Sequence, residues 1–145
     1  MSYLCTPYLY LSQMNRKDYE IMAPVGSYES LMAAINAGAD SIYFGIEGLN
    51  MRSKSANNFT TEDLYKIAAI CREHDVKSYL TVNTIIYDED LELMRKIIDS
   101  AKDADVSAII AADVAPMLYA RSIGVEVHLS TQLNITNVEA LRFYA

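Results

Sequence analysis

The chain has 145 residues, of which 52% are apolar, and a formal net charge of −7 at pH 7. This length and composition fit one globular domain with a buried core and exclude a low-complexity chain. The excess of acidic residues disfavours broad nonspecific binding to nucleic acid, because such binding needs Lys and Arg to displace phosphate counterions. A local basic patch is still compatible with this net charge.

The two cysteines, Cys5 and Cys71, stand far apart in unrelated contexts. They therefore predict neither a disulfide framework nor a CxxC metal site, and a reducing compartment fits best. No apolar run reaches the ~18 residues that a membrane-crossing helix needs, and the first residues do not resemble an export signal. We expect a cytoplasmic protein without a membrane partner.

The stretch from Ile21 to Gly45 spells out a strand, a turn, a helix and a second strand. A short apolar strand ends at Pro24 and Gly26, and Ser27 is placed to cap the helix that follows. Gly38 suits the left-handed residue that ends such a helix, before Ser41 to Phe44 form the next strand. Two strands joined by a helix in so short a span are parallel.

The same pattern repeats along the rest of the chain. After a polar loop from Ile46 to Asn58, the sequence predicts helices at 61–74, from a cap at Asp88 to 102, at 114–123 and after a cap at Asn137, and strands at 77–83, 108–112 and 125–130. Thr60 and Asp63 form a capping box before the first of these helices. The result is five strand–helix units.

Alternating units with nearly continuous apolar strands predict an α/β fold with a parallel sheet covered by helices. Because a closed barrel of this kind needs eight strands, five units would form a partial TIM-barrel-like arc. The alternative is a doubly wound open parallel sheet, although no GxGxxG follows the first strand. We assign residues 1–17 to an N-terminal extension and 18–145 to the N-terminal part of a truncated barrel-like domain.

Ligands of parallel strand–helix folds gather at the carboxyl ends of the strands, and these ends are polar here. The candidate substrate-binding residues are Arg52, Asn57, Asn83, Asp113, His128, Ser130 and Gln132. The alternative to substrate binding is a structural role. Asn83 and Asp113 could be turn or cap residues, and Arg52 and Asn57 could belong to a solvated loop.

A hydrolytic triad from Asp113, His128 and Ser130 is not favoured. Residues two apart on a strand are separated by about 6.6 Å, whereas a base must come within about 3 Å of its nucleophile. His128 and Asp113 also fall short of the three ligands that a metal site normally has, so we expect no metal site and leave the catalytic residues unknown.

Five segments carry a resemblance to a known family: APVGSYESLMAAINAGADSIYFG, RSKSANNFT, YLTVNT, AIIAADVAPM and VHLSTQLNITNVEALRFY. From about Glu20 onward the chain closely resembles the N-terminal part of the collagenase-like peptidase family, the U32 peptidases of unassigned mechanism. The resemblance implies a TIM-barrel-like domain and a protease or collagenase activity. Several members look instead like components of oxygen-independent hydroxylation of tRNA, rRNA or a quinone precursor.

The hydroxylation members carry an iron–sulfur cluster, whose cysteine ligands would lie beyond Ala145. The resemblance thus implies no cofactor within this chain, although a cluster could belong to a full-length protein. We expect the chain alone to be an inactive fragment of an enzyme whose substrate, a small molecule, a peptide or RNA, stays unknown. It could self-associate or dock the missing C-terminal half. The remaining alternatives are a noncatalytic binding or assembly module and an unrelated barrel enzyme that binds phosphate at Gly26 and Ser27.

Overall fold

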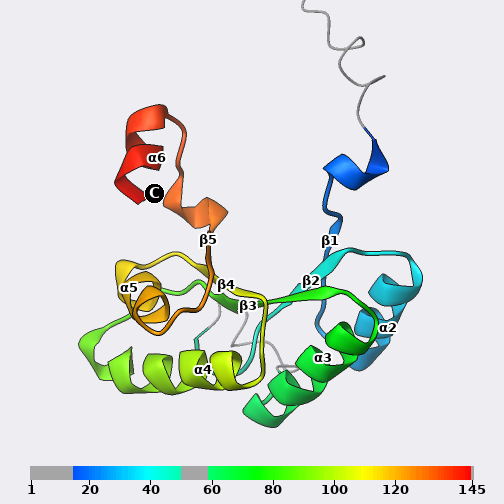
Figure 1. Cartoon of the computed structure of the whole chain (residues 1–145). Coiled ribbons are helices and arrows are strands. Elements are labelled where there is room, and N and C mark those ends of the chain that lie inside the picture. Colours follow the sequence, from blue (N-terminus) through cyan, green and yellow to red (C-terminus); the bar gives the residue numbers. More distant parts are fainter. Residues whose placement is uncertain (1–14, 50–58, 145) are drawn as a thin grey trace, which may run out of the picture.

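A computed structural model describes residues 15–49 and 59–144 (Figure 1). The strands are β1 (Met22–Pro24), β2 (Ser41–Phe44), β3 (Lys77–Val82), β4 (Ala108–Ala111) and β5 (Val127–Leu129). The α-helices are α2 (Tyr28–Asn36), α3 (Thr61–Glu73), α4 (Leu91–Asp103), α5 (Val114–Ser122) and α6 (Val138–Tyr144). Short 3₁₀ turns are η1 (Arg16–Asp18), η2 (Asp88–Asp90) and η3 (Thr131–Leu133).

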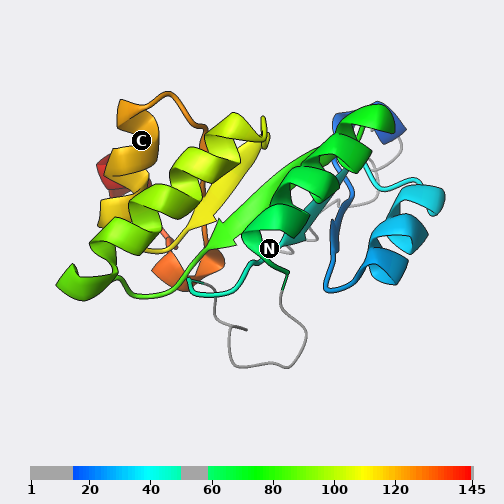
Figure 2. The same ribbon diagram turned by 90° about the horizontal axis from the view of Figure 1, so that it is seen from below.

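The five strands form one sheet in the order β1-β2-β3-β4-β5, and every neighbouring pair is parallel. This confirms the predicted α/β fold with parallel strand–helix units. Helices α2, α3, α4 and α5 lie on one side of the sheet in Figure 1, and in Figure 2 helices α3 and α4 lie in front of the strands. Right-handed crossovers that always advance in one direction place every helix on the same face. A doubly wound sheet would reverse its strand order partway, so the sequential order disagrees with that alternative.

Most predicted helix starts are confirmed by hydrogen bonds. Ser27 Oγ accepts from Ser30 N, Thr60 and Asp63 form the expected capping box, and Asn137 Oδ1 accepts from Ala140 N at 2.9 Å. The prediction for α4 was wrong, because Asp88 begins η2 and the helix starts only at Leu91. The 3₁₀ turn absorbs the residues that the sequence pattern assigned to the first helical turn.

The helix ends share one turn, in which a left-handed residue is followed by a buried residue. The left-handed residues are Gly38 (φ 80°), Asp75 (φ 55°), Asp105 (φ 61°) and Gly124 (φ 79°). The next amide bonds a helix carbonyl five residues back, as in Val76 N to Cys71 O at 2.9 Å and Val106 N to Ala101 O at 3.0 Å. This is the Schellman pattern, with aspartate in the left-handed place where glycine is more usual.

The two faces of the sheet differ in burial. Phe44, Leu80 and Ile109 align across β2, β3 and β4, and all three are buried against the helices. Side chains alternate along a strand, so the residues between them point to the opposite face, which we call the inner face. The register aligns Tyr43 with Tyr79 on the inner face, one level before the row of Thr81, Ile110 and His128.

The segment before β1 is tied to the fold. Arg16 Nη2 lies 2.9 Å from Asp40 Oδ2, and the same oxygen accepts from Ile21 N at 2.6 Å. Together these contacts hold η1 beside the turn that precedes β2. The division at residue 17 stays a prediction, since residues 1–14 lie outside the described part. No helix within the described ranges combines the length and apolarity needed to cross a membrane.

Candidate functional site

Asp113 lies two residues after the end of β4 and caps α5. Its Oδ1 accepts from Ala115 N at 2.9 Å, and its Oδ2 accepts from Ile86 N at 3.3 Å. Both carboxylate oxygens therefore bond backbone amides, one in the helix and one in the loop after β3. The carboxylate joins two neighbouring loops at the carboxyl edge of the sheet, as a cap residue does.

Ser130 and Gln132 form a second pair at this edge. Ser130 is buried, its amide donates to Ala111 O at 2.8 Å, and its hydroxyl lies 3.3 Å from both Gln132 N and Gln132 Oε1. Ser130 is thus the cap of η3, and the exposed Gln132 folds back over it. Asn134 ends η3 in a left-handed conformation with φ 51°.

Asn83 follows β3 as Ser130 follows β5. Because Val82, Ala111 and Leu129 align in the register, the next residues along, Asn83 and Ser130, stand at one level of the sheet. The neighbouring Thr84 adds a buried hydroxyl that makes no hydrogen bond within the described residues. Polar groups therefore line this edge at β3, β4 and β5, as parallel strands predict.

Arg52 and Asn57 lie outside the described residues. The loop that carries them leaves the sheet after β2, and the chain on its two sides is joined by a parallel bridge between Ile46 and Phe59. Phe59 packs edge-on against Phe44, with ring centroids 6.1 Å apart. The loop thus begins and ends beside the carboxyl end of β2.

His128 is not joined to Ser130. Its Nε2 lies 3.0 Å from Glu126 Oε1, and its ring centroid lies 4.7 Å from that of Tyr79 at a tilt of 58°. The Ser130 hydroxyl is engaged with Gln132 instead. His128 and Ser130 therefore do not form a nucleophile–base pair, as the strand spacing predicts.

A polar cluster on the inner face was missed by the sequence analysis. Glu20 Oε2 lies 2.7 Å from Lys77 Nζ, and Glu20 Oε1 accepts from the Tyr79 hydroxyl at 2.6 Å. Chiefly through Lys77 and then Tyr79, these bonds lower the pKa of Glu20 to about 2. Burial and the bond to Glu20 raise the pKa of Tyr79 to about 12. Glu20 therefore stays ionised and the phenol of Tyr79 stays neutral over a wide pH range.

Part of this cluster had a signal in the sequence. Lys77, Tyr79 and Thr81 alternate along β3, so the period-two pattern of a strand would have placed all three on one face. Glu20 had none, because it lies 59 residues before Tyr79 and reaches it only in the folded chain. Ser41 lies close enough to contribute to the lowered pKa of Glu20, but its buried hydroxyl makes no hydrogen bond of normal geometry.

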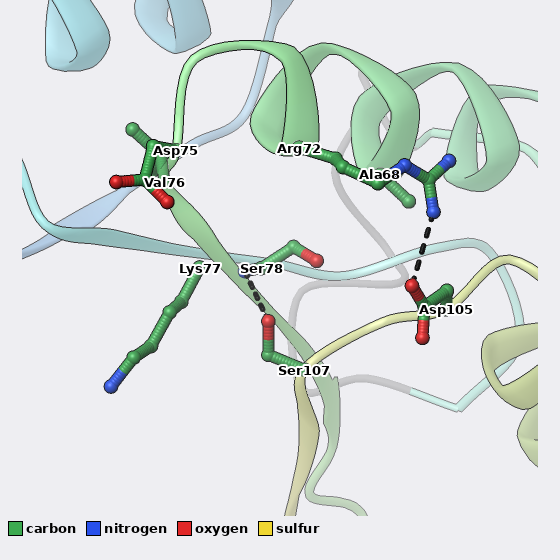
Figure 3. A pocket seen from close by; sticks show the side chains of 8 residues that line it. All are labelled: Ala68, Arg72, Asp75, Val76, Lys77, Ser78, Asp105 and Ser107. Atoms are coloured by element: carbon green, nitrogen blue, oxygen red, sulfur yellow. Dashed lines mark hydrogen bonds and ion pairs between the residues drawn. The ribbon is translucent and has the colours of Figure 1, made fainter.

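A shallow hollow of about 210 Å³ lies at the other edge of the sheet, near the amino ends of β3 and β4 (Figure 3). An Arg72–Asp105 ion pair of 3.2 Å crosses it, and Ser107 Oγ accepts from Ser78 N at 3.2 Å. Lys77 points away from this pair in Figure 3. Because the hollow lies near the amino ends of the strands, it is distinct from the polar carboxyl edge.

The described residues do not fit an iron–sulfur cluster. No three His, Cys, Asp or Glu side chains come together as a metal site within 15–49 and 59–144. Cys71 is buried, and burial raises the pKa of its thiol to about 11, which disfavours the thiolate that a cluster needs. Cys5 lies outside the described part. Any cluster would need ligands from elsewhere.

The fold and the polar carboxyl edge define an α/β protein built from sequential parallel strand–helix units. The sequence model of Peptidase family U32 matches residues 26–145. The chain therefore belongs to peptidase family U32, as the sequence resemblance predicted.

Two of the relatives carry names of different kinds. The chain is 78% identical over 132 residues to a protein named "Collagenase" from Porphyromonas gingivalis, covering 91% of this chain and 32% of that protein. It is 33% identical over 130 residues to a tRNA hydroxylation protein of Bacillus subtilis, covering 88% of this chain and 31% of that one. The chain thus spans about a third of these curated relatives.

A solved structure supports the fold. The U32 peptidase Mk0906 superposes with a TM-score of 0.67 at 11% identity, over 86% of this chain and 53% of that one. At this identity the likeness concerns the arrangement of strands and helices.

Proposed function

We propose that this chain forms the N-terminal, ligand-binding part of a collagenase-like U32 enzyme. Its ligand lies at the carboxyl edge of the sheet, over Asn83 and Ser130, with Gln132 at the rim and His128 beneath. The observation that carries the proposal is the alignment of Asn83 with Ser130 after two parallel strands of one sheet. The 78% identity to a protein named as a collagenase favours a peptide as the substrate.

The proposal assigns the bond-breaking groups to other parts of the protein. The hydroxyl of Ser130 bonds Gln132, and His128 bonds Glu126. Since hydrolysis needs an activated nucleophile or a metal-bound water, the chain alone would bind substrate without turning it over. We further propose that it works in the cytoplasm and docks against the rest of a longer chain along the exposed sheet edges.

A second function is favoured by one observation, the 33% identity to a tRNA hydroxylation protein. In this alternative the same edge would present an RNA nucleotide to a hydroxylation reaction. The net charge of −7 speaks against it, because phosphate groups would be repelled unless basic residues gather locally.

The test compares the 145-residue chain with a longer protein in which this chain is joined to the C-terminal part of the 78%-identical relative. Both are incubated with gelatin and with fluorogenic peptides, and we expect cleavage by the longer protein only. Cleavage by the short chain would contradict the proposal. Nucleoside mass spectrometry of RNA from a strain lacking the gene tests the alternative, for which a lost hydroxylated nucleoside is the supporting result.

Ser130→Ala in the longer protein tests the site itself. We expect a rise in KM of about tenfold, the size of a lost hydrogen bond of ~1.4 kcal/mol. Ser122→Ala is the matched control, because Ser122 bonds Tyr119 O on α5, away from the inner face. An unchanged KM in Ser130→Ala would remove Ser130 from the proposed site.

A further inference from the structure

The imidazole of His128 is held from two directions. Tyr79 of β3 packs against its ring at 4.7 Å between centroids, and Glu126 of β5 lies 3.0 Å from Nε2. Ile110 is the aligned residue of β4, between the two strands. The ring position is therefore set by one aromatic contact and one hydrogen bond.

Tyr79 is itself fixed. Its side chain is buried in the sheet, with 3% of the residue exposed, and its hydroxyl donates to Glu20 Oε1 at 2.6 Å. The other oxygen of Glu20 accepts from Lys77 at 2.7 Å. A phenol anchored at both its ring and its hydroxyl has little freedom to turn, so it offers His128 a fixed packing surface.

We infer that Tyr79 is a positioning residue: it holds the His128 imidazole on the inner face, toward the amino ends of the strands. Glu20 in turn fixes Tyr79. Tyr79 aligns with Tyr43 and Ala108, one level nearer the amino ends of the strands than the row of Thr81 and His128. The contact therefore draws the imidazole away from the level of Ser130. His128 thus forms the floor of the proposed strand-end site, beneath Asn83 and Ser130.

This position gives His128 a defined hydrogen-bonding role. When the ring is neutral and Nε2 donates its hydrogen to Glu126, Nδ1 is left as an acceptor. Nδ1 makes no hydrogen bond to any residue in the described ranges. The floor thus suits a ligand group that donates a hydrogen bond, such as a peptide N–H or a hydroxyl. This last step rests on the proposed function, whereas the position of the ring does not.

The experiment uses NMR, because the chain contains only two histidines, His74 and His128. Protein labelled with carbon-13 and nitrogen-15 at histidine gives separate imidazole signals, and His74 serves as the internal reference. We expect nuclear Overhauser contacts between the rings of Tyr79 and His128 in the unsubstituted protein. Their absence from a folded sample would overturn the inference without any variant.

Two substitutions separate positioning from general packing. Tyr79→Leu should remove the ring-current shift of the His128 protons. Tyr79→Phe should retain most of it, because the aromatic ring stays although the bond to Glu20 is lost. Tyr119→Leu is the matched control, since Tyr119 also donates to a carboxylate, Asp99 at 2.8 Å, but lies on α5. Identical His128 signals in Tyr79→Leu and the unsubstituted protein would overturn the inference.

The ligand step has its own readout. In the longer protein we expect Tyr79→Leu to raise KM for a peptide about tenfold with a smaller change in kcat, and Tyr79→Phe to restore most of it. If Tyr79→Leu moves the His128 signals but leaves KM unchanged, the contact between Tyr79 and His128 has no role in ligand binding. Loss of peptide binding in every preparation would instead count against the proposed function and leave the NMR result standing.

Discussion

The hydroxyl of Tyr79 lies 2.6 Å from Oε1 of Glu20, across a sequence separation of 59 residues. Tyr79 is on the central strand β3, and Glu20 comes just before β1, at the edge of the sheet. The bond therefore links the entry of the chain to the middle of the inner face. Charge-assisted bonds of this length are among the stronger hydrogen bonds in proteins.

The first prediction concerns Glu20→Gln. The amide keeps the shape but loses the charge that Lys77 and Tyr79 bind, so we expect the free energy of unfolding at pH 7 to fall by about 1 kcal/mol. Urea denaturation followed by circular dichroism measures this change. Glu92→Gln is the matched control, because its pair with Lys96 is also 2.7 Å long but far more exposed. Equal losses in both variants would contradict the special role of Glu20.

The pH dependence of this contribution has a definite sign. Folding lowers the pKa of Glu20 from 4.5 to about 2, so the unfolded chain takes up the proton first as the solution is acidified. The stabilisation is complete above about pH 5 and disappears as the pH falls toward 2. The difference between the unsubstituted protein and Glu20→Gln should therefore shrink over this range. A difference that stays constant down to pH 2 would show that the charge is not responsible.

The second prediction separates the two roles of Asp113. Asp113→Ala removes the cap of α5 and the acceptor for Ile86 N, and should cost about 1–2 kcal/mol of unfolding free energy. Asp113→Asn keeps an acceptor oxygen and should recover most of this loss. A folded, equally stable Asp113→Ala protein with weakened ligand binding would favour a ligand contact over a cap.

The third prediction is a stabilising change at Asp75. This residue has φ 55° at the end of α3, where a negative charge opposes the helix dipole. Asparagine tolerates the left-handed conformation and removes the charge. Asp75→Asn should therefore increase the free energy of unfolding by about 0.5 kcal/mol and raise the melting temperature. Asp105→Asn is the comparison, since Asp105 has φ 61° but pairs with Arg72 at 3.2 Å. The rise in melting temperature should be smaller for Asp105→Asn than for Asp75→Asn. A larger rise for Asp105→Asn would contradict the dipole argument.

The fourth prediction concerns Cys71. Its side chain is buried in α3, and burial raises the pKa of the thiol to about 11. In a Cys5→Ser protein, the only remaining thiol should resist a disulfide reagent at pH 8 until the chain unfolds. Rapid labelling of the folded protein would show that α3 opens or that the thiol is accessible.

Local sequence patterns predicted much of the fold because capping and periodicity are short-range. The cap at Ser27 and the capping box at Thr60 were correct, since each depends on residues three positions apart. The start of α4 was placed too early, because an acidic run at 88–90 can cap a helix or form a 3₁₀ turn equally well.

The candidate site was harder to predict. Asp113 and Ser130 lie at the ends of strands as expected, yet what they bond depends on neighbouring loops. His128 was singled out, but its contact with Tyr79 was not. The alternation along β3 can place Tyr79 on the inner face, yet it does not show that the ring reaches β5 across β4. Arg52 and Asn57 stay predictions outside the described residues.

By itself, the sequence determined the succession of strands and helices, because each unit is set by hydrogen bonds and side-chain periods a few residues long. Only the tertiary structure decided which side chains share the inner face. Parallel neighbours are joined through whole helices, so the strand order and register that bring Glu20, Tyr79 and His128 together arise from packing between distant segments.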